Sequence, residues 1–205
     1  MGSQTQDDQF SLPERLPVMV LGGAVLFPKQ CLTLNIFEPR YRAMLQQVLE
    51  GGRMFAIASP AEDLPSGVEW IGGAGLVRAC VGRPDGTSQL VLLGMCRVRF
   101  SRWVQMKPFP VAEVEVYGAG AQAGAPGAVA ARLKGLRKAL EPYTVFMPGE
   151  LVKSFGQLQC PEALTDMVAS FLLKEHAHRQ AILSEESAAV RQELLLRLLA
   201  EVFPV

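Results

Sequence analysis

The chain has 205 residues and is 49% hydrophobic, so it can bury a sizeable core, which argues against a disordered protein. Its 20 basic and 20 acidic residues give a formal net charge of zero. Nucleic-acid binding normally requires a basic excess, so a nucleic-acid partner is not expected. No apolar run approaches the ~18 residues of a membrane span, and the N-terminus lacks a secretory signal. We therefore expect a cytoplasmic globular protein with no membrane partner.

Composition divides the chain into four segments. Residues 1–14 are polar and are interpreted as a flexible tail. Residues 15–117 combine several strand patterns with one strong helix, whereas residues 128–205 contain only helical patterns. Between them, residues 118–127 read GAGAQAGAPG, a composition typical of a flexible linker. These patterns predict an α+β protein in which a strand-rich domain precedes a helical one.

The stretch from residue 16 to residue 50 organises the first domain. Pro17 to Leu21 form a continuous apolar run typical of a buried strand, and the Phe27-Pro28 pair marks the loop that follows. Residues 31–37 alternate apolar and polar side chains, as a half-buried strand does. A helix is then predicted from Pro39, a favourable first helical position, with one apolar stripe. Such a helix needs a sheet beneath it to bury that stripe.

Further strand patterns complete the first domain. They cover residues 54–58, 71–81, 89–103 and 111–117, and a turn at residues 83–87 joins the second and third of them into a hairpin. Glycines at positions 72, 73 and 75 predict a bulge or a close backbone approach, and Gly94 predicts a twist or bulge in the returning strand.

The alternation after Gly94 assigns two arginines to the solvent face of the sheet. Arg97 and Arg99 alternate with apolar residues along their strand. If this strand pairs with the last one, the two arginines face Glu113 and Glu115. We interpret these four side chains as a charged surface with no further role.

Three helical patterns follow the linker. They cover residues 128–140, 161–178 and 184–202, with an irregular, proline-bracketed stretch at residues 142–148. His176 and His178 fall at the end of the second helix. Glu185 and Glu186 fall in the first turn of the third, where negative charge is favourable. We expect these helices to pack as a bundle or against the sheet.

No catalytic, metal or cofactor site is predicted. His176 and His178 are the only histidines, and residues two apart on a helix do not share a face. A Ser-His or Cys-His nucleophile would need one of them as its base, and no matching signature accompanies either. The four cysteines form no C-x-x-C pair, so a zinc site is not expected. The glycine-rich run at residue 73 leads into a strand, whereas a phosphate loop leads into a helix.

Two short motifs are candidates for contact with a partner. Phe27-Pro28 lies at an apolar loop tip, which is either a core plug or an exposed contact. Residues 38–42, Glu-Pro-Arg-Tyr-Arg, are most simply a helix start with a local ion pair. Arg40 and Arg42 could instead reach a peptide carboxylate or carbonyl.

Five strings stand in order along the chain: LPVMVL, VLFP, LTLNIFEPRYRAML, IGGAGLVRACVGRPDGTSQLVLLGMCRVRF and PFPVAEVEVY. In this order they resemble the N-terminal substrate-recognition domain of the Lon (La) ATP-dependent protease, especially its small free-standing bacterial versions. The resemblance covers about residues 15–203. It implies a PUA-like β-barrel with one packed helix, followed by a C-terminal helical bundle. By position alone, it makes Phe27, Pro28, Phe37, Arg40 and Arg42 the candidate binding residues.

The resemblance also implies a function, the recognition of unfolded or tagged protein segments in protein quality control. A protease or a chaperone is a further candidate partner. The chain ends at Val205 without the ATPase and peptidase modules of a full Lon protease, so we expect binding without catalysis. The alternative is a PUA-like RNA-binding protein, against which the neutral charge argues. A hydrolase is a third hypothesis, and it lacks a base and nucleophile pair.

Overall fold

The computed structural model describes residues 11–118 and 126–204. The strands are β1 (Arg15–Val20), β2 (Cys31–Ile36), β3 (Met54–Ala58), β4 (Ile71–Gly82), β5 (Ser88–Gln105) and β6 (Val111–Val116). The helices are α1 (Pro39–Glu50), α2 (Pro126–Leu140), the 3₁₀ helix η2 (Glu141–Phe146), α3 (Gly149–Gln157), α4 (Pro161–Leu172), α5 (His176–Ser184) and α6 (Ala188–Val202). The predicted tail lies outside the described residues except at positions 11–14, and the predicted linker except at positions 118, 126 and 127.

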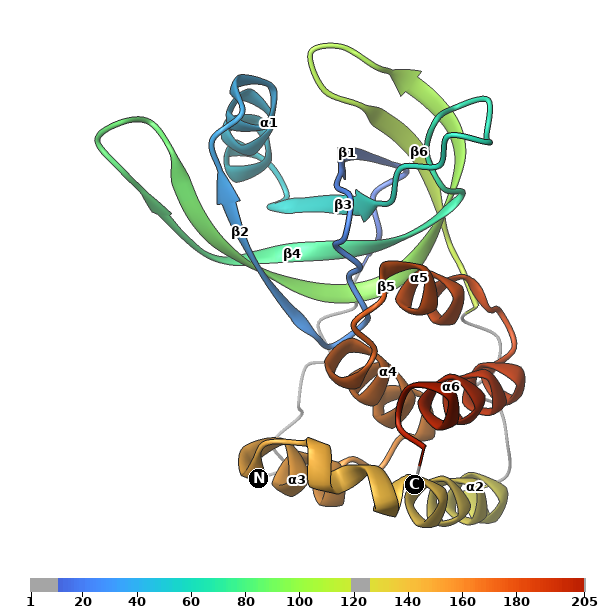
Figure 1. Cartoon of the computed structure of the whole chain (residues 1–205). Helices are drawn as coiled ribbons and strands as arrows, with labels where there is room; N and C mark the ends of the chain where they lie inside the picture. The colour runs from blue at the N-terminus through green and yellow to red at the C-terminus, as the bar shows by residue number, and fades with distance from the viewer. Residues whose placement is uncertain (1–10, 119–125, 205) are drawn as a thin grey trace, which may run out of the picture.

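The six strands form one mixed sheet in the order β2-β5-β4-β3-β1-β6, and β5 also pairs with β6 (Figure 1). The first half of β5 pairs with β2, with Leu93 opposite Cys31, and its second half pairs with β6, with Val98 opposite Val116. Within the described ranges β2 has β5 as its only strand partner, so it forms an edge. The PUA-like barrel expected from the sequence is therefore not confirmed, and the fold is a mixed α+β arrangement.

The glycines of β4 and β5 let a loop lie directly on the sheet, as the sequence predicts. A Cβ on Gly73 would lie 2.0 Å from the carbonyl oxygen of Leu26, and one on Gly94 would lie 2.0 Å from that of Phe27. The β4–β5 register also shifts here, because Gly75 faces Gly94 and Met95 is left as an extra residue. The loop is thus pinned to the sheet, with Leu26 and Phe27 fully buried.

Helix α1 covers one side of the sheet with the stripe that the sequence predicts. Tyr41, Met44, Leu45 and Val48 are its buried residues. The Tyr41 hydroxyl accepts from the backbone N–H of Val20 at 3.1 Å and donates to the carbonyl of the same residue at 3.0 Å. These bonds tie the helix to β1.

The helical half departs from the prediction in three places. Helix α6 begins at Ala188, so Glu185 and Glu186 precede it and the prediction that they lie in its first turn is wrong. Helix α3 was not predicted, because its nine residues include two glycines, which lower helix propensity. Its apolar stripe is short, with Leu151 and Phe155 one turn apart against the core. The predicted helix over residues 161–178 is two helices, since α4 ends at Leu172. His176 and His178 therefore begin α5 instead of ending α4, so their expected position at the end of a helix is wrong.

The helices share their core with the sheet. Helix α4 packs against α2, α5 and α6, and α5 packs against β4. Val25, Phe27 and Ile71 belong to the same apolar cluster as the buried residues of these helices. In Figure 1, α1 and the group α4–α6 lie on opposite sides of the sheet. A separate C-terminal bundle is therefore not confirmed, because these helices are completed by residues of the strand-rich half.

Candidate binding site between the sheet and the helices

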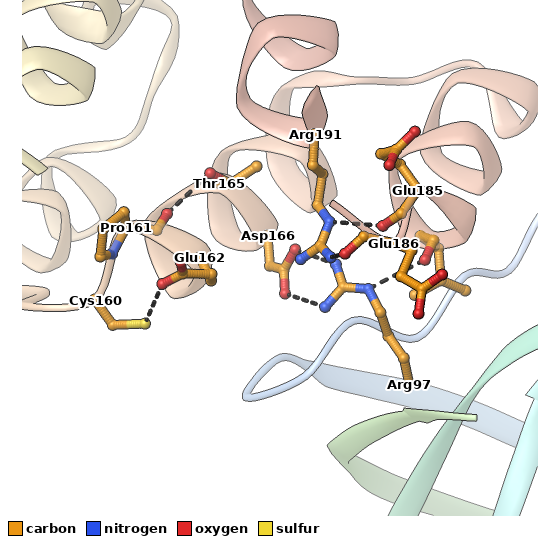
Figure 2. A network of polar contacts seen from close by, with 10 residues as sticks. Arg97, Cys160, Pro161, Glu162, Thr165, Asp166, Glu185, Glu186 and Arg191 are labelled. Carbon is orange, nitrogen blue, oxygen red and sulfur yellow. Dashed lines mark hydrogen bonds and ion pairs between the residues drawn. The ribbon is translucent and has the colours of Figure 1, made fainter. Parts of the chain in front are cut away.

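A buried ion pair joins β5 to α4. The Arg97 side chain donates from Nη1 to Asp166 Oδ2 at 2.9 Å and from Nη2 to Asp166 Oδ1 (Figure 2). Both residues are almost fully buried, with 6% and 2% of their surface exposed. The prediction that Arg97 lies on a solvent face with Glu113 is therefore wrong. Its face of the sheet is covered by α4 and α5, which the alternation of a strand cannot reveal.

Further polar contacts fix the α5–α6 connection above this pair. Arg97 Nε donates to the Leu183 carbonyl at 3.1 Å. Arg191 donates from Nε to the Glu185 carbonyl and from Nη2 to the Glu186 carbonyl, both at 3.1 Å. The Tyr117 hydroxyl donates to the Ser184 carbonyl at 2.9 Å. The charged side chains thus satisfy backbone carbonyls that the end of α5 leaves without helical partners.

A second buried contact ties α5 to the other strands. Gln180 is 8% exposed, and its Oε1 accepts from the Ser59 hydroxyl at 2.7 Å. Its Nε2 donates to the Ile71 carbonyl at 3.0 Å. Buried amides need such partners, so this contact fixes the position of α5 on the sheet.

Next to the ion pair lies a cavity of about 290 Å³ between the sheet and the helices. Its walls come from the loop before β2, the bulge of β5, the end of β6, and the first turns of α4 and α6. The lining residues are Pro28, Lys29, Met95, Cys96, Arg97, Val116, Tyr117, Gly118, Cys160, Glu162, Ala163, Asp166, Ala188 and Arg191. The volume is close to the lower limit for small-ligand sites, and the mixture of apolar walls and a few polar groups is typical of them.

The two thiols of the cavity are poor nucleophiles. Burial raises the pKa of Cys96 to about 11, and burial also raises the pKa of Cys160. The Cys160 thiol donates to Glu162 Oε2 at 3.1 Å. Because the thiolate is the reactive form, these side chains suit a wall that holds a ligand better than one that attacks it.

The structure separates the five residues that the sequence proposes for binding. Phe27 is fully buried, with the Arg97 guanidinium 6.0 Å from its ring centroid, so of the two alternatives it is a core plug. It cannot contact a partner in this conformation, because α4–α6 and the sheet enclose it. Its neighbour Pro28 lines the cavity.

The other three candidates lie around the start of α1. Phe37 is 66% exposed and lines a smaller cavity of about 100 Å³ with residues of β1 and β2. Arg40 donates to Glu38 at 2.8 Å and lies over the Tyr41 ring at 4.4 Å, which is the local ion pair that the sequence suggests. Arg42 is exposed and lies beside the turn at Gly86. Of the five candidates, Pro28 and Phe37 thus line two different cavities, and Phe27, Arg40 and Arg42 line neither.

Sequence reasoning missed Arg97, Asp166 and Arg191 as site residues. One signal was available: Asp166 is the only charged residue between Ala163 and Leu173, a mostly apolar stretch in which a carboxylate requires a buried partner. The histidines play no part in the cavity. In residues 11–118 and 126–204, no group of three or more His, Cys, Asp or Glu side chains could hold a metal ion. None of the helices within those ranges is long and apolar enough to cross a membrane.

Comparison with protein families gives a match over nearly the whole chain. The family described as the ATP-dependent protease La (LON) substrate-binding domain matches residues 15–201. Lon protease 1 of Herpetosiphon aurantiacus is 24% identical over 195 residues, and the Lon protease of Phenylobacterium zucineum is 27% identical over 215 residues. These alignments cover 90% and 98% of this chain but 24% and 26% of the relatives. The chain thus spans about a quarter of the length of these relatives.

Solved structures agree with this match at the level of the fold. The N-terminal domain of the Mycobacterium avium complex Lon protease superposes with a TM-score of 0.71 at 16% identity, covering 89% of this chain and 96% of that one. The Lon N-terminal domain protein from Xanthomonas campestris gives a TM-score of 0.65 at 21% identity, covering 89% and 97%. Both similarities include the sheet and the helices.

Proposed function

This chain belongs to the family of ATP-dependent protease La (LON) substrate-binding domains, and from this membership we propose that it is a non-catalytic module that binds protein segments. The observation that carries the proposal is the family match over residues 15–201. The matched range contains every residue that lines the cavity, on the sheet side and on the helix side.

The cavity supports the proposal because it can hold a segment without reacting with it. Its thiols have raised pKa values. Its most polar group, the Arg97–Asp166 pair, is already satisfied by internal hydrogen bonds. Catalysis by acid and base would require groups free to exchange protons with a substrate. Phe37 and the small cavity beside it supply a second apolar surface that a partner could cover.

We propose unfolded or tagged polypeptide segments as the ligands, with a protease or chaperone as the recipient. The proposal includes a cytoplasmic location, supported by four cysteines that form no disulfide in the structure. It also includes a division into a strand-rich unit over residues 15–117 and a helical unit over residues 128–205. The shared apolar core suggests that these two units fold together.

The test is a calorimetric titration of the whole chain with an unfolded polypeptide such as casein. We expect saturable binding at tens of micromolar or tighter. A stably folded protein of similar size is the control, and it should not bind. Absence of heat with the unfolded polypeptide, while circular dichroism reports an intact fold, would overturn the proposal. Retention on RNA that falls steeply with salt would favour the nucleic-acid alternative instead.

A further inference from the structure

The charges that line the cavity do not balance. Asp166 is paired with Arg97, and Glu162 is paired with Arg132 at 2.9 Å. These are the two acidic residues of the lining. Lys29 and Arg191 also line the cavity, and neither has an ion-pair partner among the described residues. Neither cation is therefore in direct contact with a carboxylate, although Asp166, Glu162 and Glu185 lie close enough to Arg191 to favour its charged form.

Arg191 is the more informative of the two because it is only 3% exposed. It donates from Nε and Nη2 to carbonyls, whereas Nη1 donates no hydrogen bond within the described ranges. Burial, together with the nearby Arg97 guanidinium, lowers the pKa of Arg191. Two backbone carbonyls accept from Arg191, but it makes no direct ion pair, and buried charges in natural proteins are usually paired. An anion in the cavity would supply that pairing.

Two helix N-termini reinforce the positive potential. The first turns of α4, at Glu162 and Ala163, and of α6, at Ala188 and Arg191, both line the cavity. In Figure 2, Arg191 lies above the buried ion pair and Pro161, at the start of α4, lies to its left. Helices of 12 and 15 residues have partial positive charge at this end, which favours an anion there.

The remaining walls are apolar and select the kind of anion. Met95, Val116 and Tyr117 contribute a hydrophobic side, and Val116 is half exposed at the opening. A space of about 290 Å³ is enough for one or two amino-acid residues but not for a folded domain. A polypeptide whose last residue is apolar has a carboxylate next to an apolar side chain. It therefore matches both the cationic side and the apolar side of the cavity.

We propose that this cavity binds the C-terminal carboxylate of a polypeptide segment, with Arg191 and Lys29 as its counter-ions and Met95 and Val116 against its last side chain. The inference rests on the proposed function and names the part of the ligand that the site selects. The backbone of Lys29 is fixed at the edge of the cavity, because its N–H donates to the Gly94 carbonyl at 2.7 Å.

The experiment compares three fluorescent peptides that share an apolar sequence ending in valine and leucine. The first has a free C-terminus, the second a C-terminal amide, and the third an amide with an internal aspartate. By fluorescence anisotropy with the wild-type chain, we expect the amide to bind about 10- to 100-fold more weakly than the free acid, the range of a charge-assisted hydrogen bond. The third peptide should bind like the amide.

Variants then assign the effect to the cavity. In Arg191→Gln the ratio between free acid and amide should fall to about one. Because Arg191 is buried and its loss can unfold the chain, Lys29→Gln is a second variant on the exposed rim, with an expected loss of about 2- to 5-fold for the free acid only. Lys138→Gln, an exposed cation on α2 that does not line the cavity, should change nothing.

Each contrary outcome has a distinct meaning. Equal binding of free acid and amide would overturn the carboxylate site and leave the proposed function standing. Equal binding of the free acid and the aspartate peptide would overturn the selection of a chain end. Binding of unfolded casein without binding of any of the three peptides would also overturn the inference. Failure of casein and peptides alike would overturn the proposed function as well.

Discussion

Two arginines of β5 form ion pairs of opposite kinds. Arg102 donates to Glu113 on the outside of the sheet, where Arg15 also donates to the same carboxylate. Arg97 donates to Asp166 under the helices. The arginine side chain of the outer pair is 61% exposed, and that of the inner pair is 6% exposed. An arginine–carboxylate ion pair of β5 is thus a surface contact at Arg102. At Arg97 it is a buried connection between the sheet and α4, which we call the joint.

The difference lies in what happens when a partner is lost. Water can solvate Arg102 in place of Glu113, so the outer pair contributes little and is screened by salt. Arg97 and Asp166 are 6% and 2% exposed, so water solvates Arg97 far less well than it solvates Arg102 when the partner is lost. The inner pair therefore acts mainly by making separation of α4 from β5 unfavourable, and each half of the chain then needs the other.

The largest expected effect is that of Asp166→Ala. The substitution leaves the Arg97 charge buried without a partner, which should lower the free energy of unfolding by about 3–5 kcal/mol. That is a large part of the stability of an ordinary domain. Urea unfolding followed by circular dichroism measures it. Glu113→Ala is the matched control on the outer pair and should leave the urea midpoint nearly unchanged. Similar midpoints for the two variants would mean that the inner pair is not a joint.

A smaller effect is expected when both partners of the inner pair are replaced. Arg97→Met with Asp166→Leu removes both charges and keeps apolar volume, so most of the loss in Asp166→Ala should be recovered. The Leu183 carbonyl loses its donor, so the double variant should remain about 1–3 kcal/mol less stable than the wild type. The same urea experiment tests this. A double variant as unstable as Asp166→Ala would show that the charges themselves are required.

Thiol labelling reports on the joint without unfolding the chain. Cys31 is exposed, whereas Cys96 lies at the cavity with a pKa of about 11 against the usual value of 9.0. The thiolate fraction of Cys96 near neutral pH is therefore about 100-fold below that of an unperturbed thiol. With iodoacetamide and mass spectrometry, we expect Cys31 to be modified first and Cys96 at least about 100-fold more slowly. In Asp166→Ala the rate at Cys96 should rise, and an unchanged rate would mean that the cavity stays closed without the ion pair.

The sequence predicts the strand-rich half well because its signals are local. The strand at Met54–Ala58 has the observed bounds, and Pro39 begins α1 as expected. The close backbone approach at Gly73 and the bulge at Gly94 also agree with the prediction from the glycines in these strands. The bounds of these elements depend on neighbours within about one turn or one hairpin, although the loop that lies on Gly73 comes from distant Leu26.

The candidate site is less accessible to sequence reasoning because its partners are distant along the chain. Asp166 lies 69 residues after Arg97, and Arg191 belongs to a third element. Alternation shows that Arg97 and its neighbours Cys96 and Val98 face opposite ways, but it does not show which face the helices cover. The burial of the loop at Phe27 is equally hard to predict, because an apolar loop tip has the same sequence whether it is buried or exposed.

The smallest expected effect belongs to the outer pair and depends on pH. The hydrogen bond from Arg102 holds the pKa of Glu113 below its usual value of 4.5. The folded state thus favours the carboxylate, so the contribution of this group is present above about pH 4.5 and is lost as the pH falls through the lowered pKa. Glu113→Gln should match the wild type in urea midpoint at neutral pH and high salt, and should weaken the acid dependence slightly at low salt. A strong loss of stability at neutral pH would contradict the contrast with Asp166, because it would show that an exposed pair also acts as a joint.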